Sequence, residues 1–543
     1  MGRRTTTWMG SVAMTRRQLL AAGAVGAASA MVVTRPAGAA SLPFALTSPA
    51  GPAPHPRLKV GKPVAAYDRI EHIIIVMMEN HSFDNILGSC GRGDGLTFAG
   101  GDTSTRALNT NPNRPDDLNY ATNKTIRAFE MPTTVQMAEK PSQAWGASWT
   151  QFYGTDSPTS EYLGDGSYPA ERNSGFVLSD SGPVGMGYYT EEHVPFIRSM
   201  ARNFPIADRW FGSCMAQTYP NRRFMMAGTS LGQTWNDLSM SDLPRNGTIL
   251  QAMSEHNISW KNYFGSLPST LIWPGQGRDV SFFDHLRGIE NYFIDAKNGT
   301  LPSVSIVDPN FDQASGENAE DVQHHDAFLQ KVVTAAVKGK HWDRTLLVFT
   351  YDEHGGYYDH VPPPTAPVPD ASVPQVVVKP GDVWAGGSEY VGFGRLGFRV
   401  PAIVVSPYAK PGYVTSTVFD HTAVMKLIQK KWNLPSFTPR DAASNDPWEM
   451  VDLEAPPAFP TFRSTGLAGP TIEFGGSRPV SPAIGSYRPT HEETAVYPDG
   501  GPKVPGFGIP RRKQYYEKKN GTPLPAKGET PFYTALRQAW EQS

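Results

Sequence analysis

Residues 345–356 read TLLVFTYDEHGG, an apolar run that ends in two acids, a histidine and two glycines. A run without a regular polar face is typical of a strand covered on both sides, as in a parallel sheet between two helical layers. Similar runs stand at 70–78 (IEHIIIVMM) and 400–407 (VPAIVVSP). Apolar residues at helical spacing occur at 194–201 and 326–337. This order predicts an α/β fold with a largely parallel β-sheet sandwiched by helices.

Polar pairs follow two of these runs directly. Glu79 and Asn80 come after the first, and Asp352 and Glu353 come after the run at 345–351. Parallel sheets bind ligands at the carboxyl ends of their strands, and adjacent acids there repel each other unless a cation compensates them. Taken alone, each pair also fits a turn at the end of a strand. Together they predict one divalent metal site; oxygen ligands favour Ca, Mg or Mn, and a histidine ligand would admit Zn or Fe.

A third polar segment, AQTYPNRR at 216–223, contains a hydroxyl and a basic group. The Thr218 hydroxyl could become a nucleophile if a metal lowers its pKa. The planar guanidinium of Arg222 could hold phosphate. Pro220 and Asn221 fit the start of a helix, whose N-terminus favours an anion. Without the acidic pairs this segment is an ordinary helix start, so its catalytic interpretation depends on them.

Four histidines are candidates for protonating a leaving group. His354 and His360 follow the acid pair at the end of the 345–351 run. His324 and His325 could donate a proton or ligate the metal, and they fit equally well as exposed imidazoles at a helix N-terminus. The sequence does not choose among the four.

The other histidines and both cysteines have no polar motif next to them in the sequence that indicates a catalytic or metal-binding role. His421 precedes a helical pattern, where a structural hydrogen bond is the simplest expectation, and His341 and His256 have no supporting neighbours in the sequence. Cys90 and Cys214 form no metal-knuckle pattern. A disulfide and two free thiols both fit them.

The N-terminus predicts export. Arg16 and Arg17 precede a mild apolar stretch at 21–33, and small residues cluster at 36–40. Residues 1–40 therefore resemble a twin-arginine signal peptide, because the apolar stretch is short for a membrane span. We expect the mature protein in the periplasm, at the cell wall or outside the cell.

The remaining chain divides by composition. Residues 41–66 are rich in Pro, Ala and Gly and predict an extended lead-in, 67–450 the catalytic domain, and 455–543 a smaller Pro-rich C-terminal appendage. The segment 361–390 predicts a long loop beside the site. A formal net charge of -2 gives no electrostatic reason to expect a nucleic-acid partner.

In this order, the motifs resemble the phosphoesterase family of bacterial and plant non-specific phospholipase C and related acid phosphatases. The likeness covers about 68–445 and consists of the stretches MMENHSFDN from Met77, MGYYTEEHVPF from Met186, TYPNRRFMMAGTS from Thr218, LPSVSIVDP from Leu301, TYDEHGGYYDHVPPP from Thr350 and HTAVMKLIQKKW from His421.

The resemblance implies an alkaline-phosphatase-like core. It places the family's metal ligands on Glu79, Asn80, Asp352 and Glu353, and its nucleophilic hydroxyl on Thr218. It implies a phospholipase C that cleaves phosphatidylcholine-type lipids to diacylglycerol and a phosphorylated head group, with transient contact to a membrane surface. One alternative is an acid phosphatase acting on small phosphomonoesters. The other is a secreted, non-catalytic binding protein on the same scaffold.

The sequence departs from the family at two places. Gln143 stands where many members have a histidine, and 320–325 reads EDVQHH where members often have Asp-Glu-His-Pro or Asp-Asp-His-Pro. These departures leave His324 or His325 as alternative proton donors. Thr218 also stands where formylglycine sulfatases have Cys or Ser, which argues against sulfate esters.

Overall fold

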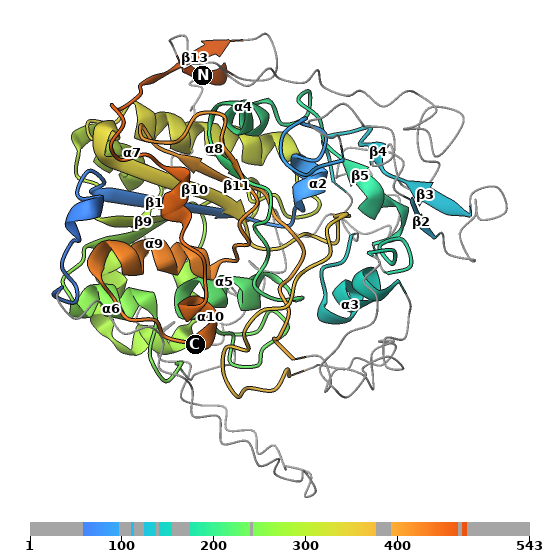
Figure 1. Ribbon diagram of the computed structural model, residues 1–543, viewed down its shortest axis with the longest axis horizontal. Coiled ribbons are helices and arrows are strands. Elements are labelled where there is room, and N and C mark those ends of the chain that lie inside the picture. The colour runs from blue at the N-terminus through green and yellow to red at the C-terminus, as the bar shows by residue number, and fades with distance from the viewer. Residues whose placement is uncertain are drawn as a thin grey trace, which may run out of the picture.

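An eight-stranded sheet forms the centre of the protein (Figure 1). The computed structural model describes residues 58–96, 110–112, 124–136, 141–154, 173–179, 181–238, 243–375, 392–464 and 470–474. The strand order is β12-β6-β11-β10-β1-β9-β7-β8. The bounds are β1 His72–Met78, β6 Ile206–Ala207, β7 Trp260–Phe264, β8 Leu286–Gly288, β9 Val304–Asp308, β10 Thr345–Tyr351, β11 Ala402–Val405 and β12 Val414–Thr415.

The sheet is largely parallel, as predicted. β11 runs antiparallel to β10 and β6, whereas the other pairings in this sheet are parallel. This arrangement decides which strand ends lie together. The carboxyl ends of β1, β9 and β10 share an edge, and the antiparallel β11 presents its beginning, next to Arg399, at that same edge.

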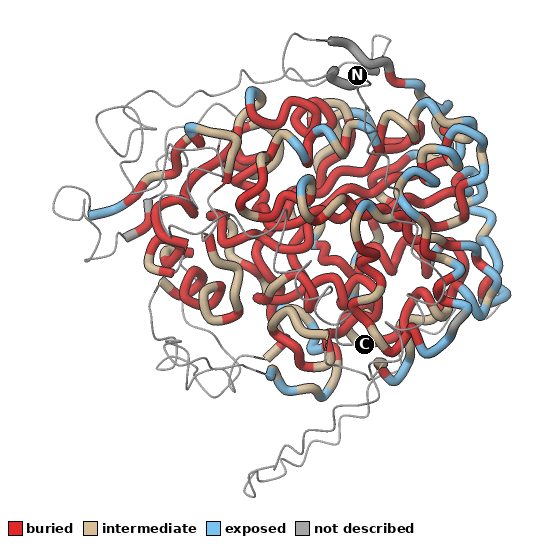
Figure 2. Tube along the Cα trace, turned by 180° about the vertical axis from the view of Figure 1, so that it is seen from behind, coloured by how far each residue is buried: buried red, intermediate tan, exposed pale blue. Residues whose placement is uncertain are grey.

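Helices cover both faces of the sheet (Figure 1). One layer contains α4 Pro195–Asn203, α7 Glu290–Asn298 and α8 Val322–Val337, and the other contains α5 Thr218–Ala227, α6 Ile249–Glu255, α9 Thr422–Trp432 and α10 Pro439–Ala442. The sandwich explains why the central strands lack an alternating pattern. Every residue of β1 and β10 is buried, and the buried core runs along the sheet (Figure 2).

Smaller elements gather beside the carboxyl ends of β1 and β10 (Figure 1). They are α2 Phe83–Ile86, β2 Thr110–Pro112, β3 Thr125–Arg127, β4 Phe129–Glu130, α3 Trp145–Tyr153 and β5 Gly187–Tyr188. The 3₁₀ helices are η2 Ala65–Tyr67, η4 Gly182–Met186, η5 Ser269–Ile272, η6 Pro274–Arg278, η7 Val280–His285, η8 Trp342–Arg344 and η10 Pro447–Met450. In the appendage, β13 Pro460–Ser464 pairs antiparallel with β14 Pro470–Phe474.

Several sequence predictions fall outside the described residues. These are the signal peptide at 1–40, the lead-in up to residue 57, residues 376–391 around the predicted loop, and the appendage after residue 474. The last part of the lead-in is described and packs on α9, since Gly61 and Val64 donate their main-chain N–H groups to Trp432 and Lys431. Within the described ranges no helix is both long and apolar enough to cross a membrane. Cys90 and Cys214 are both free thiols.

Candidate active site

The two acidic segments lie next to each other. β1 and β10 are parallel neighbours, with Met78 opposite Tyr351. Just beyond them, the N–H of Asp352 donates to the carbonyl oxygen of Met78 at 3.0 Å, and the N–H of Asn80 donates to Oδ1 of Asp352 at 3.2 Å. Two segments far apart in sequence therefore present their polar side chains at one edge of the sheet, as the parallel order predicts.

The backbone of these two loops adopts positive φ angles at three residues. Asn80 has a φ of 69°, and the loop that follows Glu353 turns through Gly355 at 67° and Gly356 at 76°. A Cβ atom on Gly355 would lie 2.0 Å from the carbonyl oxygen of Asn80, so a side chain there would push the two loops apart. Gly355 is thus required by the close approach of the two acidic segments.

The site holds more negative charge than the sequence motifs indicate. Glu79, Asp352 and Glu353 are buried, and two further buried acids, Asp308 at the end of β9 and Glu317, join them. Burial raises the pKa of Glu79 well above its ordinary value, and the charges of Glu317 and Asp352 raise it further. Burial followed by the charge of Asp352 does the same to the pKa of Glu353. Such a cluster is costly to ionise without a counter-charge.

Arg222 supplies part of that counter-charge, in a different way from the one expected. Its Nε donates to Oδ2 of Asp352 at 3.1 Å, and its Nη2 donates to the carbonyl oxygens of Met77 and Met78 at 3.1 and 3.2 Å. Its Nη1 lies 3.9 Å from Oδ1 of Asp308. The expected fork for phosphate is therefore directed at the protein itself, and Arg222 ties α5 to the ends of β1, β9 and β10.

A group of buried oxygen atoms accepts or donates no hydrogen bond within the described part of the chain. They are both carboxylate oxygens of Glu79, Oδ1 of Asn80, Oγ1 of Thr218 and Oε1 of Glu353. Buried polar atoms are rarely left without a partner unless a ligand supplies one. Oxygen donors in this number and with this charge suit a hard divalent cation. The residues present thus fit the metal that the sequence predicts.

The predicted nucleophile lies at the start of a helix. α5 begins at Thr218, and the threonine side chain is fully buried. The N-terminal end of a helix carries partial positive charge and exposed N–H groups, which favour an anion. Because Oγ1 of Thr218 has no hydrogen-bond partner in the described chain, none of the four candidate histidines bonds to it as a base.

The four candidate histidines lie in different surroundings. His354 is buried and shares a hydrogen bond of 2.7 Å with Oε1 of Gln151, and burial lowers its pKa to about 3. His325 is buried, and its Nε2 bonds the Tyr351 hydroxyl at 3.1 Å. Burial lowers the pKa of His325 well below its ordinary value.

The other two candidates are more accessible. His324 is exposed on the first turn of α8, and its Nδ1 shares a hydrogen bond with the carbonyl oxygen of Gln313. It is therefore an exposed imidazole at a helix N-terminus, the second of the two possibilities that the sequence left open. His360 is only slightly exposed and belongs to a separate charged network. His421, for which a structural hydrogen bond was expected, bonds the carbonyl oxygen of Asp352 through Nε2 at 2.6 Å.

The network around His360 is compensated within the chain. Its Nδ1 and main-chain N–H both bond Oδ2 of Asp84, at 2.7 and 2.8 Å. Arg399 donates to Asp84 and Asp359 at 3.1 and 2.8 Å. Burial opposes ionisation of Asp84, but His360 and Arg399 outweigh it and hold its pKa below the ordinary value.

Three side chains from His, Cys, Asp or Glu come together with all ligand atoms within 4.8 Å at two places in the described chain. One is the compensated network of Asp84, Asp359 and His360, and the other contains Glu71, His72 and His341. The carboxylates around Glu79 do not meet this spacing. They are set wider apart than the side chains of these two groups.

Sequence reasoning missed three residues of this edge. Asp308 ends a buried strand, the same signal that singled out the two acid pairs, and could have been found in that way. Glu317 follows no strand directly, so that signal could not indicate it. Arg399 lies before the antiparallel β11, whereas the sequence analysis considered the residues that follow each apolar run. Gln143 is beside the glycine loop, since a Cβ on Gly356 would lie 2.4 Å from the carbonyl oxygen of the preceding Ser142.

Comparison with known proteins agrees with the motifs. The model of the Phosphoesterase family matches residues 70–435. Non-specific phospholipase C1 of Arabidopsis thaliana is 29% identical over 413 residues, 70% of this chain and 70% of that protein. Non-specific phospholipase C3 of the same plant is 27% identical over 398 residues, 68% of this chain and 71% of that protein.

A bacterial relative and a solved structure were also found. Phospholipase C B of Mycobacterium tuberculosis is 29% identical over 432 residues, 72% of this chain and 78% of the relative. A crystal structure of a protein in the alkaline phosphatase superfamily from Vibrio parahaemolyticus aligns with 83% of this chain and 82% of its own, with a TM-score of 0.35 and 11% identity.

Proposed function

Since the chain belongs to the phosphoesterase family and is a phosphoric ester hydrolase, we propose that it is a phospholipase C that uses Thr218 as its nucleophile. The observation that carries this proposal is the set of partnerless buried oxygens on Glu79, Asn80, Glu353 and Thr218. A binding protein without catalysis would not need a buried hydroxyl without a partner together with an acid cluster that Arg222 compensates only in part. The names of the plant and mycobacterial relatives favour a phospholipid as the substrate.

Glu79, Asn80, Asp352 and Glu353 are the residues that would hold a divalent metal. A bound cation would supply charge that lowers the pKa of the nearby hydroxyl and neutralises the phosphate oxygens. Arg222 keeps Asp352 in place through its Nε and fixes the end of β1 through two carbonyl oxygens. We therefore assign Arg222 a positioning role, in place of the phosphate contact expected from the sequence.

The reaction proceeds in two steps, transfer of the phosphorylated head group to Thr218 and its release by water. Oγ1 of Thr218 forms a bond to phosphorus and gives up its proton, while the bond from phosphorus to the glycerol oxygen breaks and that oxygen takes up a proton. Diacylglycerol leaves, and the phosphorylated head group stays on Thr218. Water then adds to phosphorus and the Thr218–phosphorus bond breaks, which releases the phosphorylated head group and restores the hydroxyl.

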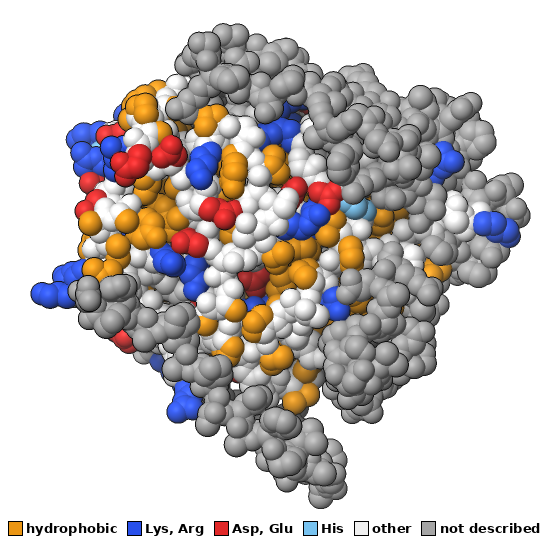
Figure 3. Space-filling model, in the orientation of Figure 1, with side chains coloured by type: hydrophobic (Ala, Val, Ile, Leu, Met, Phe, Trp, Pro, Cys, Tyr) orange, Lys and Arg blue, Asp and Glu red, His pale blue; other side chains and the backbone are white. Residues whose placement is uncertain are grey.

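One face of the molecule presents both apolar and acidic side chains. On the face shown in Figure 3, hydrophobic side chains gather near the middle, where acidic side chains are also visible. A phospholipid needs both kinds of surface, because its head group is charged and its acyl chains are apolar. The membrane contact of the enzyme would be transient on this proposal.

A substrate panel tests the proposal. The purified enzyme is incubated with phosphatidylcholine vesicles and with an aryl phosphate, each with and without a chelator. We expect diacylglycerol and phosphocholine from the first substrate, slower phosphate release from the second, and loss of both with the chelator. Phosphate release from the aryl ester without any diacylglycerol would instead identify an acid phosphatase.

Export by residues 1–40 is a separate proposal, which rests on Arg16 and Arg17 ahead of a short apolar stretch. Fusion of these residues to a folded reporter should deliver it across the membrane. Replacement of both arginines by lysine should keep the reporter in the cytoplasm, and delivery that persists would contradict a twin-arginine signal.

A further inference from the structure

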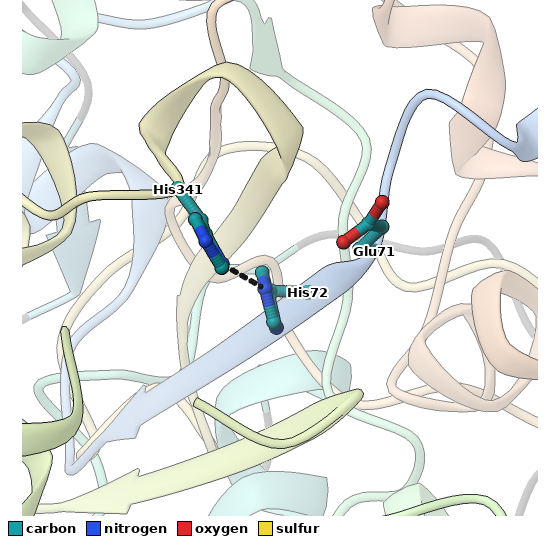
Figure 4. Close-up of side chains that lie close together, drawn as sticks. All are labelled: Glu71, His72 and His341. Carbon is teal, nitrogen blue, oxygen red and sulfur yellow. Dashed lines mark hydrogen bonds between the residues drawn. The ribbon is translucent and has the colours of Figure 1, made fainter. Parts of the chain in front are cut away.

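The edge of the sheet opposite the active site carries a compact group of possible metal ligands. Glu71 and His72 stand at the start of β1, and His341 directly precedes η8, which leads into β10 (Figure 4). The ligand atoms of these three side chains all lie within 4.8 Å of one another. In the sequence, His341 has no supporting neighbours, and the fold supplies them.

The two imidazoles of the group contact each other directly. Nε2 of His72 and Nδ1 of His341 share a hydrogen bond of 3.2 Å, and the rings are stacked with centroids 5.4 Å apart (Figure 4). Two nitrogens bound to one tetrahedral Zn²⁺ at about 2.0–2.1 Å lie about 3.4 Å apart. The separation of the hydrogen-bonded nitrogens is therefore close to the one that a shared ion requires, and the ion would take the place of that hydrogen bond.

The tautomer of His72 is also suitable. Nδ1 of His72 lies 3.0 Å from the carbonyl oxygen of Pro302, which can only accept a hydrogen bond. Nδ1 must therefore carry the proton, and Nε2 presents its lone pair towards His341. At metal sites, a histidine ligand usually donates its other ring N–H to a carbonyl or carboxylate oxygen in this way. Burial lowers the pKa of His72, which favours the neutral form of the ring that a metal ligand needs.

The backbone of His341 is also held in place. Its carbonyl oxygen accepts from Oγ1 of Thr345 at 2.7 Å and from the N–H of Arg344 at 3.0 Å. Glu71 donates its own N–H to the carbonyl oxygen of Arg344 at 2.8 Å. The three ligand positions thus belong to one hydrogen-bonded corner of the sheet.

Arg344 is the group that opposes a cation here. Its Nη1 bonds Oε1 of Glu71 at 2.8 Å, and both side chains are about half exposed. An exposed ion pair of this kind contributes about 0–1 kcal/mol, so a metal can compete for the carboxylate. The pair also keeps the carboxylate near the imidazoles.

From this geometry we propose that Glu71, His72 and His341 form a second metal site, selective for a transition-metal ion such as Zn²⁺. Two imidazole nitrogens and one carboxylate oxygen favour Zn²⁺ over Ca²⁺ or Mg²⁺. The ion links the amino ends of β1 and β10, whose carboxyl ends carry the catalytic acids. β1 has 7 residues, so the two sites are separated by about 23 Å, and the second ion acts on stability and not on the reaction.

The test uses the full chain with excess Mg²⁺ or Ca²⁺ present to satisfy the oxygen-rich site. Zn²⁺ is titrated in competition with a chromophoric chelator, and the melting temperature is recorded in parallel. We expect one Zn²⁺ per chain and a higher melting temperature on binding. His341→Ala should weaken this binding at least about 100-fold, since even the loss of a group that only orients a ligand costs about 10–100-fold. It should also abolish the thermal shift while hydrolysis stays within about twofold of wild type.

His256→Ala is the matched control, because this partly exposed histidine lies outside the group. It should leave Zn²⁺ binding unchanged. Arg344→Ala should tighten binding a few-fold by releasing Glu71. Equal Zn²⁺ affinity in wild type and His341→Ala would overturn the proposal, as would a Cu²⁺-loaded protein whose paramagnetic resonance spectrum shows no nitrogen coupling. The tests replace His341 because it is only partly buried, so its variant should fold. No variant of the buried His72 is needed.

Discussion

The main-chain N–H of Asn80 donates to Oδ1 of Asp352 at 3.2 Å. This bond joins the loop after β1 to the loop after β10, two segments that are separated by 272 positions in the sequence. It also fixes the side chain of Asp352, whose other oxygen accepts from Arg222. Asp352 is therefore oriented by both of its oxygens before any ligand binds.

Thr218→Ala should reduce turnover at least about a thousandfold, because it removes the atom that bonds to phosphorus. Folding should be nearly unchanged, since Oγ1 makes no hydrogen bond in the described chain. Thr218→Ser, which keeps the hydroxyl, should retain a substantial part of the activity. Kinetics on phosphatidylcholine and the melting temperature check both variants, and near-normal turnover in Thr218→Ala would refute the assignment of the nucleophile.

The stability gained from metal should increase with pH. Burial, then the charges of Glu320 and Asp352, raise the pKa of Glu317 to about 8, against about 4.3 in an unfolded chain. Between these values the folded, metal-free protein binds more protons than the unfolded chain, so its stability falls as pH rises. A cation removes this penalty by pairing with the carboxylates.

Melting curves with metal and with chelator at pH 5 and pH 8 measure this effect. The difference in melting temperature should be larger at pH 8. A difference that is constant or shrinks towards pH 8 would mean that these carboxylates are not the ones that the metal pairs with.

Arg222→Lys should weaken metal binding and lower stability together, because a lysine cannot reach Asp352 and two carbonyl oxygens at once. Its neighbour Arg223 offers a matched control. Arg223 is also fully buried, but it donates to the carbonyl oxygens of Ile272 and Asp237, away from the acids. Arg223→Lys should lower the free energy of unfolding without changing metal affinity, as calorimetric titration can show. Equal losses of metal affinity in both variants would argue against the positioning role of Arg222.

Arg399→Met should destabilise the protein by about 3–5 kcal/mol, because it leaves Asp359 buried without its counter-charge and Asp84 with His360 alone. Adding Asp359→Asn should recover part of that loss by removing one of the stranded charges. Urea unfolding of the single and double variants gives both numbers. If the second substitution makes the protein still less stable, the network is not held together by charge compensation.

The sequence predicted a largely parallel sheet, three of its strands and the meeting of the two acid pairs at one edge. The run at 345–351 became β10 with the same bounds, because a strand covered on both faces leaves an uninterrupted apolar signal. Parallel strands end at one edge, so Glu79 and Asp352 could be placed together without coordinates. The helix predicted at 326–337 begins earlier, at Val322, where Asp321 caps it by accepting from the N–H of Gln323.

The role of Arg222 could not be predicted from the sequence. Its residue type fits a phosphate ligand and a structural ion pair equally well, and only the positions of Met77, Met78 and Asp352 around it separate the two. Arg399 was missed because β11 runs antiparallel, which the apolar pattern does not reveal. Strand direction and the use of each donor depend on tertiary structure, which local sequence does not encode.

Diffraction from crystals soaked in Mn²⁺, measured with anomalous scattering, tests the central claim most directly. We predict a peak bounded by oxygen atoms of Glu79, Asn80, Asp352 and Glu353, with Oγ1 of Thr218 next to it. A Mn²⁺ peak at Asp84, Asp359 and His360 with none beside Thr218 would contradict the account.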